Sequence, residues 1–385
     1  MERVVVDKAA ENSLASGHLW IFSNEVQERP QHLPAGELVE VHGARGAFLG
    51  IGYINPKSLI MVRILTRRRI AVDEAFFAKR ISNALKWREG RFGGSFRIVN
   101  AESDFLPGLI IDKYEDALAI QMLTWGMEQQ KETIIAASER VLSPKAIVLR
   151  NESPAREDEG LPHQTQVVKG DLKQETIVKM GPLRFLVDLI SGHKTGFYFD
   201  QRENRLLTKE FASDAAVLDC FSYTGAFGVH ALFYGARRAT FVDSSARALE
   251  LARENLRINK LSGGEFIKAD VFDFLKSGVN EYDLVILDPP SFIKSKKKVK
   301  EGEKGYIDLH KKALRRLAQG GSLFTFSCSH HMKRQRFRDL LRIAAYAKAD
   351  VYLVRELTQS PDHPVMLTIP ETEYLKGLIL RVLRR

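Results

Sequence analysis

The second half of the chain alternates short apolar segments with amphipathic ones, and this alternation constrains the fold more than any other feature. The apolar segments are five to seven residues long and are bounded by Gly, Pro and acidic residues, which is typical of buried strands. They cover residues 216–220, 239–243, 265–270, 283–288 and 322–328. Because parallel strands need crossover connections, the helical patterns between them predict a parallel α/β sheet from about residue 189.

Polar and reactive residues close several of these segments. In open α/β sheets, ligands bind outside the carboxyl ends of the strands, so we expect a functional site at that edge. The fourth segment ends in Asp288-Pro289-Pro290, and the fifth ends in Ser327-Cys328-Ser329. These two endings are therefore the first candidates for a reactive site.

The remaining sequence predicts two smaller domains. Residues 1–70 alternate short β-rich runs with turns that contain Gly, which is typical of a small β-barrel-like domain. Residues 71–188 mix strand and helix patterns and predict an α+β middle domain, whose first helix includes Trp87 on its apolar side. With an α/β domain over residues 189–385, the 385 residues make three domains.

Composition and cysteine content exclude several classes of protein. The chain is 44% hydrophobic and 28% charged, as in ordinary globular proteins, and no apolar run approaches the length of a bilayer span. Its first residues lack the apolar core of a signal peptide. Two cysteines cannot form a disulfide framework or a four-ligand zinc site. We therefore expect a cytoplasmic protein with reduced thiols and no bound metal.

Positive charge is concentrated around the two reactive endings. The net charge is +10, and residues 291–348 alone contain 16 Lys and Arg against four acids. This pattern predicts a polyanionic partner close to Cys328. The alternative is that these cations lie on ordinary solvated helix faces.

The turn after the first apolar segment predicts a nucleoside-containing cofactor. Gly225 and Gly228 allow either close approach of the backbone to a ligand or a tight turn, and Asp243 ends the next segment, where a carboxylate commonly binds ribose hydroxyls. The dinucleotide fingerprint G-x-G-x-x-G is absent. S-adenosylmethionine, which carries no phosphate, therefore fits better than a dinucleotide. Any single acid here could instead cap a helix or a loop.

The motifs DCFSYTGAFG, VDSS, KAD and DPPSF occur in this order and resemble those of the Rossmann-like S-adenosylmethionine-dependent methyltransferases. The resemblance implies that the first motif lines the methionine end of the cofactor, the second holds the ribose and the third contacts the adenine. Before these motifs, Gln201 and Arg202 are candidates to reach the cofactor carboxylate. The implied cofactor-binding residues are Gln201, Arg202, Asp219, Phe221, Ser222, Tyr223, Gly225, Asp243, Ser244, Asp270, Val271 and Asp288.

Two chemistries are open at the reactive endings. The first resembles that of enzymes which methylate exocyclic amines through an Asn/Asp-Pro-Pro-aromatic signature, but here Ser291 follows the prolines and Phe292 comes one place late. In the second, Cys328 adds to carbon 6 of a pyrimidine and activates carbon 5, while Asp288 hydrogen-bonds the base. Nearby cations would favour the Cys328 thiolate. The alternative for Cys328 is a small buried apolar side chain, which we expect for Cys220.

Segments along the whole chain resemble the bacterial large-subunit ribosomal RNA 5-methylcytosine methyltransferases: SGHLWIFSNEV, NAESDFLPGLIIDKY, SGHKTGFYFDQRENR, DCFSYTGAFG, LDPPSF and SCSHH. The resemblance implies an N-terminal PUA domain, an α+β middle domain and a Rossmann-like methyltransferase domain. It also implies that Cys328 is the nucleophile. A second cysteine, which assists release in other RNA 5-methylcytosine enzymes, is absent beside the prolines, and Asp288 is the candidate base.

The expected partner is large-subunit ribosomal RNA, without any membrane association, and the sequence leaves a homodimer open. The target cytosine must be unstacked for its carbon 6 to be reached. Gly302 and Gly305 predict a mobile loop, and its lysines would follow the RNA phosphates. These lysines are Lys294, Lys296, Lys297, Lys298 and Lys300. His330 and His331 are expected to face RNA or to be structural. The alternatives are an RNA exocyclic-amine methyltransferase and a non-catalytic ribosome assembly factor that binds RNA.

Overall fold

The structure is a computed structural model that describes residues 1–385 except 29, 173–174, 193–194, 279–280 and 294. The chain forms two compact units. The first comprises Met1–Met180, Asp188–Phe199 and Asp362–Thr372, and the second comprises Gly181–Val187, Asp200–Pro361 and Glu373–Arg385. None of the helices in the described residues has both the length and the hydropathy needed to cross a membrane.

The first unit begins with a five-stranded sheet in the order β1-β3-β4-β5-β2. Strands β1 and β3 are parallel, and the other pairs are antiparallel. Alternate side chains of these strands fill one apolar core, with Val6, Ile21 and Val39 fully buried. The elements are β1 (Glu2–Val6), α1 (Lys8–Ala15), β2 (Trp20–Phe22), β3 (Leu38–Gly43), β4 (Phe48–Ile54) and β5 (Ile60–Thr66).

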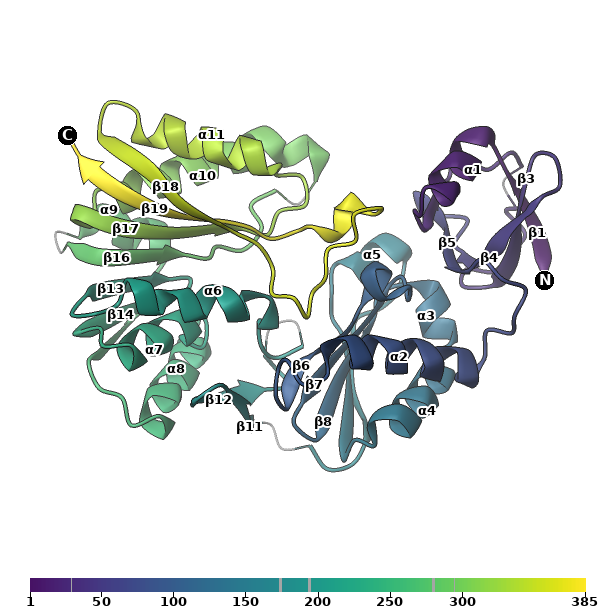
Figure 1. The fold of residues 1–385 in the computed structure, drawn as a ribbon, viewed down its shortest axis with the longest axis horizontal. Helices are drawn as coiled ribbons and strands as arrows, with labels where there is room; N and C mark the ends of the chain where they lie inside the picture. The colour runs from purple at the N-terminus through teal and green to yellow at the C-terminus, as the bar shows by residue number, and fades with distance from the viewer. Residues whose placement is uncertain (29, 173–174, 193–194, 279–280, 294) are drawn as a thin grey trace. The chain divides into compact units, whose positions relative to one another are not determined.

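A second five-stranded sheet, in the order β10-β9-β8-β7-β6, follows in the same unit and is accompanied by helices α2 and α4, which pack together (Figure 1). The Asp73 carboxylate caps α2 by accepting a hydrogen bond from Phe76 N. Phe77 and Ile81 of α2 are fully buried. The elements are α2 (Glu74–Arg88), β6 (Ser95–Asn100), η1 (Ala101–Asp104), β7 (Leu109–Tyr114), β8 (Ala117–Met122), α3 (Trp125–Gln129), α4 (Lys131–Leu142), β9 (Ala146–Asn151), α5 (Ala155–Glu159), β10 (Gln164–Lys169) and β11 (Glu175–Met180).

Trp87 differs from its predicted place on the apolar side of α2. Its side chain is 44% exposed, whereas Phe77 and Ile81 are buried as expected. At the helical period, residue 87 lies on the same face as Arg80 and Asn83, next to the buried face. The prediction that Trp87 lies on the buried, apolar side of α2 was therefore wrong: its side chain lies on the neighbouring, exposed face.

The second unit contains a seven-stranded sheet in the order β15-β14-β13-β16-β17-β19-β18. Its first five strands are parallel, as the alternating pattern predicts. The strands are β12 (Leu183–Asp188), which precedes this sheet, β13 (Ala216–Cys220), β14 (Arg238–Asp243), β15 (Gly264–Lys268), β16 (Tyr282–Leu287), β17 (Leu317–Ser327), β18 (Ala349–Leu357) and β19 (Lys376–Arg384).

Of the last two strands of the chain, β18 lies at the edge of this sheet and β19 lies inside it. Strand β19 runs antiparallel between β17 and β18. Because β19 is reversed, its first residue, Lys376, is paired with Ser327 at the carboxyl end of β17. This reversal brings a lysine to the edge where the reactive endings were predicted.

Helices cover both faces of the seven-stranded sheet (Figure 1), with α6, α7 and α8 on one side and α9, α10 and α11 on the other. A core that includes Leu287, Tyr306 and Leu323 joins β16 and β17 to the second group. The helices are η2 (Phe199–Gln201), α6 (Arg202–Leu206), η3 (Leu207–Glu210), α7 (Ala226–Phe233), α8 (Ala246–Ile258), α9 (Val271–Ser277), η4 (Lys296–Lys298), α10 (Val299–Leu314) and α11 (Arg334–Ala345). A further short helix, η5 (Pro370–Thr372), belongs to the first unit.

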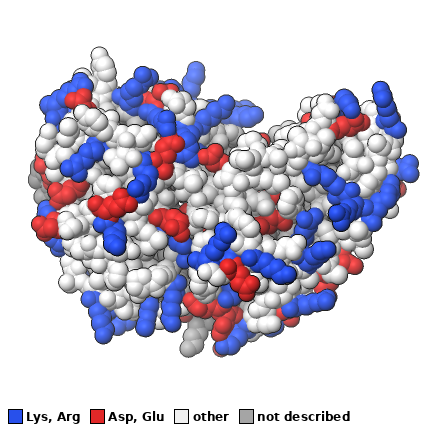
Figure 2. All heavy atoms as spheres, in the orientation of Figure 1, with Lys and Arg blue, Asp and Glu red and all other residues white. Residues whose placement is uncertain are grey.

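Only the later part of the segment that was expected to be a mobile loop, from Val299 onward, belongs to α10. Gly302 and Gly305 lie within this helix, and a Cβ atom at Gly302 would meet the Ile293 side chain at 2.4 Å. The glycine therefore allows α10 to pack closely under the residues that follow the prolines. On the surface, Figure 2 shows Lys and Arg distributed over the face drawn, with Asp and Glu among them.

Candidate active site at the carboxyl edge of the seven-stranded sheet

The carboxyl ends of β13 to β17 meet at one edge of the sheet because these strands are parallel. The structure therefore places at this edge, within the second unit, the predicted residues that end or follow these five strands. They are Asp219, Phe221, Ser222, Tyr223, Gly225, Asp243, Ser244, Asp270, Val271, Asp288 and Cys328.

The loop between β13 and α7 has an unusual backbone. Phe221 and Tyr223 have φ values of 58° and 48°, although neither is a glycine, and Gly225 follows with a φ of 76°. The Asp243 carboxylate accepts a hydrogen bond of 2.8 Å from Tyr223 N, and Ser222 N donates to the Val242 carbonyl. Residues held in the left-handed region cost free energy and are concentrated at functional sites. The end of β14 thus holds a strained loop at the edge where ligands bind.

Gly225 of this loop and Gly228 of α7 allow helix packing rather than open space for a ligand. A Cβ atom at Gly228 would lie 2.2 Å from the ring of Phe241, and one at Gly225 would lie 2.9 Å from the same ring. Gly225 also precedes α7 in the left-handed conformation. Of the two alternatives that the sequence left open, the structure supports the tight turn, together with close packing of α7 on β14.

The strand-closing acids have different environments. Asp219 is buried and accepts a hydrogen bond of 2.9 Å from Gly228 N, and its burial raises its pKa to about 7. Asp243 is half-buried, and each of its carboxylate oxygens accepts a hydrogen bond from a backbone N–H group, one from Tyr223 and the other from Ser245. Asp270 is exposed and caps α9, accepting from Phe272 N and Asp273 N. The helix-capping alternative therefore applies to Asp270, while Val271 beside it is buried.

Arg205 is a buried residue of this site that sequence reasoning missed. Gln201 and Arg202, which the sequence did single out, are also buried. Burial lowers the pKa of Arg205 to about 10, against the attraction of Asp200 and Asp288. The signal was present in the segment QRENR, where Arg205 follows Arg202 by nearly one helical turn.

Several buried polar atoms at this edge fit a polar ligand. Gln201 Nε2, Ser222 Oγ and Thr224 Oγ1 are buried and have no hydrogen-bond partner among the described residues. Buried polar atoms are nearly always hydrogen-bonded in folded proteins. An amide donor and two hydroxyl groups suit the amino-acid end of S-adenosylmethionine, and the half-buried Asp243 suits a ribose. The residues present therefore fit the predicted cofactor.

Cys328 follows β17 directly and is half-buried. Its Sγ lies 3.9 Å from the Pro289 carbonyl oxygen, so the two reactive endings meet in the fold. Cys220, in contrast, is fully buried, and burial raises its pKa well above the ordinary range of a thiol. The prediction that Cys220 is a buried apolar side chain is confirmed.

The serines on either side of Cys328 belong to a buried hydroxyl network. Tyr306 Oη donates to Ser327 Oγ at 2.8 Å and lies 3.2 Å from Ser329 Oγ, which is 2.9 Å from Ser291 Oγ. Burial raises the pKa of Tyr306 to about 12, so its hydroxyl group remains protonated. The network fixes the backbone on both sides of Cys328.

Lys376 is the second residue that sequence reasoning missed. Its Nζ donates to the carbonyl oxygens of Ser329 and Tyr374, both at 2.7 Å, and the residue is 3% exposed. Burial lowers the pKa of Lys376 to about 8, while the nearby Cys328 favours the charged form of the lysine. By the same attraction, the ammonium group favours a thiolate at Cys328. The only sequence signal was a lysine that opens the apolar strand KGLILRVL.

The predicted RNA-binding lysines lie at the start of α10. Lys296, Lys297 and Lys298 form η4, Lys300 is in the first turn of α10, and all four are exposed. Lys294 lies outside the described residues. Cations at a helix N-terminus are unfavourable with respect to the helix dipole, whereas an anion there is favourable. A phosphate group beside these lysines would relieve this repulsion.

Much of the remaining positive charge in residues 291–348 is paired. Arg336 makes an ion pair with Glu303, Arg334 with Glu373, and Arg338 with Glu356. The alternative of ordinary solvated helix faces therefore applies to α11. His330 and His331 are exposed. Within the described part of the chain, no group of three or more His, Cys, Asp and Glu residues could hold a metal ion.

Comparison with protein families identifies two regions. Residues 4–67 match the PUA-like domain family, and residues 162–381 match a family described as S-adenosylmethionine-dependent methyltransferase. The predicted fold class, with an N-terminal PUA-like domain and a Rossmann-like methyltransferase domain, is confirmed. The domain boundaries at residues 70 and 188 stay predictions.

Individual relatives cover nearly the whole chain. A protein named ribosomal RNA large subunit methyltransferase I from Pseudoalteromonas atlantica is 39% identical, with 99% of both chains covered. The protein of the same name from Klebsiella pneumoniae is 38% identical, with 99% of this chain and 98% of the relative covered. Among solved structures, a candidate S-adenosylmethionine-dependent methyltransferase from Streptococcus mutans has a TM-score of 0.86 at 22% identity, covering 99% of this chain and all of that one.

Proposed function

Because the chain belongs to the S-adenosylmethionine-dependent methyltransferase family that contains the ribosomal RNA large subunit methyltransferases I, we propose that it methylates carbon 5 of a cytidine in large-subunit ribosomal RNA. Family membership makes the chain an enzyme with S-adenosylmethionine as its cofactor, as the sequence predicts. The observation that supports carbon 5 as the target is the contact of Cys328 Sγ with the Pro289 carbonyl.

Cys328 acts as the nucleophile in the proposed reaction. Its thiolate adds to carbon 6 of cytosine, which uses the carbon 5–carbon 6 π bond and leaves an electron pair at carbon 5. Bound S-adenosylmethionine supplies the electrophilic methyl group that carbon 5 attacks. A base then removes the proton from carbon 5, the double bond forms again, and the Cys328 thiolate leaves.

Two charged side chains assist this thiol chemistry. Asp288 follows β16 and is proposed to hydrogen-bond N3 and the exocyclic amine of the base, which stabilises the adduct, and to be the candidate base for release. Lys376 is a positioning residue: its ammonium group holds the Ser329 carbonyl and favours the thiolate of Cys328. The lysine thus supplies a positive charge where the sequence suggested only diffuse cationic surroundings.

The remaining predicted residues, together with Thr224, which the sequence did not single out, bind the cofactor and the RNA in this proposal. Gln201, Ser222 and Thr224 offer their buried polar atoms to the amino-acid end of S-adenosylmethionine, and Asp243 faces the ribose. The exposed lysines from Lys296 to Lys300 contact phosphates at the N-terminus of α10. The affinity for RNA should therefore decrease steeply with salt.

The position of Phe292 argues against the exocyclic-amine alternative. That chemistry needs an aromatic ring that stacks on the target base beside the prolines. The centre of the Phe292 ring instead lies 4.7 Å from that of Tyr306 and 5.9 Å from that of Phe272, and the partly buried ring packs against the core that surrounds α10. This packing restricts the ring from turning to stack on a base.

A tritium-release assay tests the proposal. The enzyme is incubated with S-adenosylmethionine and large-subunit ribosomal RNA that carries tritium on carbon 5 of cytosine. We expect tritium release that matches methyl incorporation one to one and that is lost in Cys328→Ala. Methyl incorporation without release would instead identify the exocyclic-amine reaction. Neither signal, in a protein that binds the cofactor, would identify the assembly factor.

A further inference from the structure

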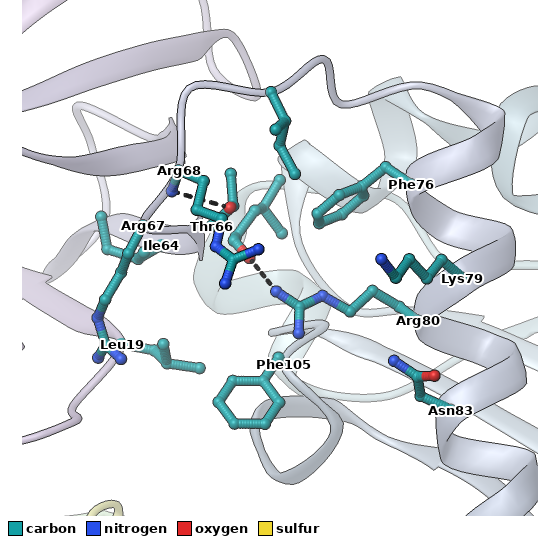
Figure 3. A pocket seen from close by; sticks show the side chains of 12 residues that line it. Leu19, Ile64, Thr66, Arg67, Arg68, Phe76, Lys79, Arg80, Asn83 and Phe105 are labelled. Carbon is teal, nitrogen blue, oxygen red and sulfur yellow. Dashed lines mark hydrogen bonds between the residues drawn. The ribbon is translucent and has the colours of Figure 1, made fainter.

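The first unit contains a pocket that has no part in the proposed reaction (Figure 3). It is a cavity of about 310 Å³ between the end of β5 and the first turns of α2. This volume is at the lower end of the range for small-ligand sites, so one nucleotide fits and a duplex does not. Figure 3 shows Arg80 extending from α2 between Phe76 and Phe105, with Arg68 reaching toward it from the end of β5.

The residues around this cavity carry four positive charges and no negative one: Arg67, Arg68, Lys79 and Arg80. The hydrogen bonds that Arg67 and Arg80 make do not neutralise their charges, because Arg80 donates to the Leu65 carbonyl and Arg67 donates to the carbonyls of Leu14 and His18. Asp104, an acid that lines the adjoining cavity along α2, accepts hydrogen bonds from both terminal nitrogens of Arg88. Four cations around a small cavity favour an anionic ligand.

The cavity also offers flat faces. The guanidinium carbon of Arg80 lies 5.4 Å from the centre of the Phe76 ring and 5.1 Å from that of Phe105. Phe105 has a φ of 57°, a costly conformation for a side chain of this size, and it places the ring against Arg80. Aromatic rings and guanidinium planes are the surfaces on which unstacked bases lie. The exposed amide of Asn83 adds a donor and an acceptor for the edge of a base.

A second cavity, of about 360 Å³, continues this surface along α2. It shares Arg80, Asn83 and Phe105 with the first and adds Trp87 and Val365. Residues 76, 80, 83 and 87 recur at the helical period, so one face of α2 forms the floor of both cavities. Trp87 is 44% exposed on this face, and its ring, whose centre lies 5.1 Å and 5.4 Å from the guanidinium carbons of Arg88 and Arg91, adds a stacking surface for a second base.

We propose that this groove along α2 binds two consecutive unstacked nucleotides of single-stranded RNA. One base stacks in the first cavity against Arg80 and Phe105, the next lies on Trp87, and Arg67, Arg68 and Lys79 contact the phosphates. The inference rests on the proposed function, since it assumes an RNA substrate, and it adds a second RNA contact in the unit that does not contain Cys328. Sequence discrimination, if measured, should come from Asn83.

Binding of a short oligonucleotide tests the groove. A fluorescein-labelled cytidine–uridine hexamer is titrated with the full chain in low salt, and its anisotropy gives the Kd. We expect Arg80→Gln to weaken binding about tenfold, because a stacking plane and a charge are lost. Arg80 also donates to Leu65, so the exposed Lys79→Gln is the second variant, with an expected loss of about threefold and a shallower salt dependence.

Lys86→Gln is the matched control, because Lys86 lies on the same helix, is exposed and does not line either cavity. The control should bind like the wild type. If Lys79→Gln and Arg80→Gln also bind like the wild type, or if all three variants weaken binding equally, the groove proposal is overturned. A duplex of the same length should bind more weakly to the wild type, and stronger duplex binding would contradict single-strand recognition.

Crosslinking separates this inference from the proposed reaction. A hexamer with one 4-thiouridine is irradiated with the Cys328→Ala variant, which cannot form the proposed adduct. We expect crosslinks in peptides that contain Phe105 or Trp87, whether or not the enzyme methylates carbon 5. Crosslinks confined to the second unit would overturn the groove while leaving the proposed reaction standing.

Discussion

Strands β13 and β17 lie in the same sheet, and each brings a cysteine to its carboxyl end: Cys220 is the last residue of β13, and Cys328 directly follows β17. The surroundings of the two cysteines differ. Cys220 is sealed among apolar side chains, and beside it burial raises the pKa of Asp219 to about 7. Cys328 is half-buried over a hydroxyl network, and beside it burial lowers the pKa of Lys376 to about 8. The comparison teaches that a thiol is not reactive merely because it lies at the end of a strand. Its reactivity depends on access to the thiol and on a neighbouring cation that favours the thiolate.

The largest expected effect comes from exchanging the two cysteines for alanine. Cys328→Ala should lower the methylation rate by roughly 10³-fold or more, because the covalent route to an activated carbon 5 is lost. Cys220→Ala leaves a small cavity in the core, so it should mainly lower the Tm by a few degrees, about 1–2 kcal/mol of stability. Methyl transfer rates and thermal unfolding of both variants check this contrast.

Removing the cation beside Cys328 should make the Cys328 thiol less reactive, and in this respect more like the thiol of Cys220. Lys376→Met is expected to lower the methylation rate about 10- to 100-fold and to move the alkylation of Cys328 by iodoacetamide to higher pH, because the thiolate loses its neighbouring charge. Lys348→Met, which removes an exposed lysine of the same unit, is the matched control. An unchanged alkylation profile in a folded Lys376→Met protein contradicts the positioning role.

The hydroxyl network predicts a smaller effect. Tyr306→Phe removes the hydrogen bonds to Ser327 and Ser329 but keeps the ring in its packing. We expect a loss of about 1–2 kcal/mol in the free energy of unfolding and a several-fold lower methylation rate, since the turn that carries Cys328 is held less firmly. Chemical denaturation and single-turnover rates measure the two effects. If the variant loses stability but keeps full methylation activity, the hydroxyl network contributes to the stability of the fold and not to catalysis.

The last prediction concerns the pH dependence of stability and the acid beside Cys220, which has no part in the proposed methyl transfer. The folded-state pKa of Asp219, about 7, is above its ordinary value of 3.8, so the wild type loses stability as pH rises between these values. Asp219→Asn does not titrate. The Tm of the variant minus that of the wild type should therefore be more positive at pH 8 than at pH 4, by on the order of 5 °C. A difference that does not change with pH would contradict the burial of an ionisable Asp219.

The sequence predicted the parallel part of the fold well because alternating apolar segments and helices leave few topologies. It also predicted that the endings at Asp288 and Cys328 meet. It could not show that β19 is reversed, and Lys376 was missed for that reason. Gly302 was misread because a glycine in a loop and a glycine under close helix packing look alike in a sequence. Trp87 was placed in the core because hydrophobicity alone does not distinguish a buried ring from a ring that lines a groove.

The difference between Cys328 and Cys220 can be measured directly with RNA that contains 5-fluorocytidine. Fluorine on carbon 5 cannot leave as a proton does, so the enzyme remains joined to carbon 6 after methyl transfer. With S-adenosylmethionine present, we predict a denaturation-resistant protein–RNA adduct, and a digest should place the nucleotide on the peptide that contains Cys328. Methylation of ordinary RNA by an enzyme that gives no such adduct, or an adduct on any other residue, would contradict the account.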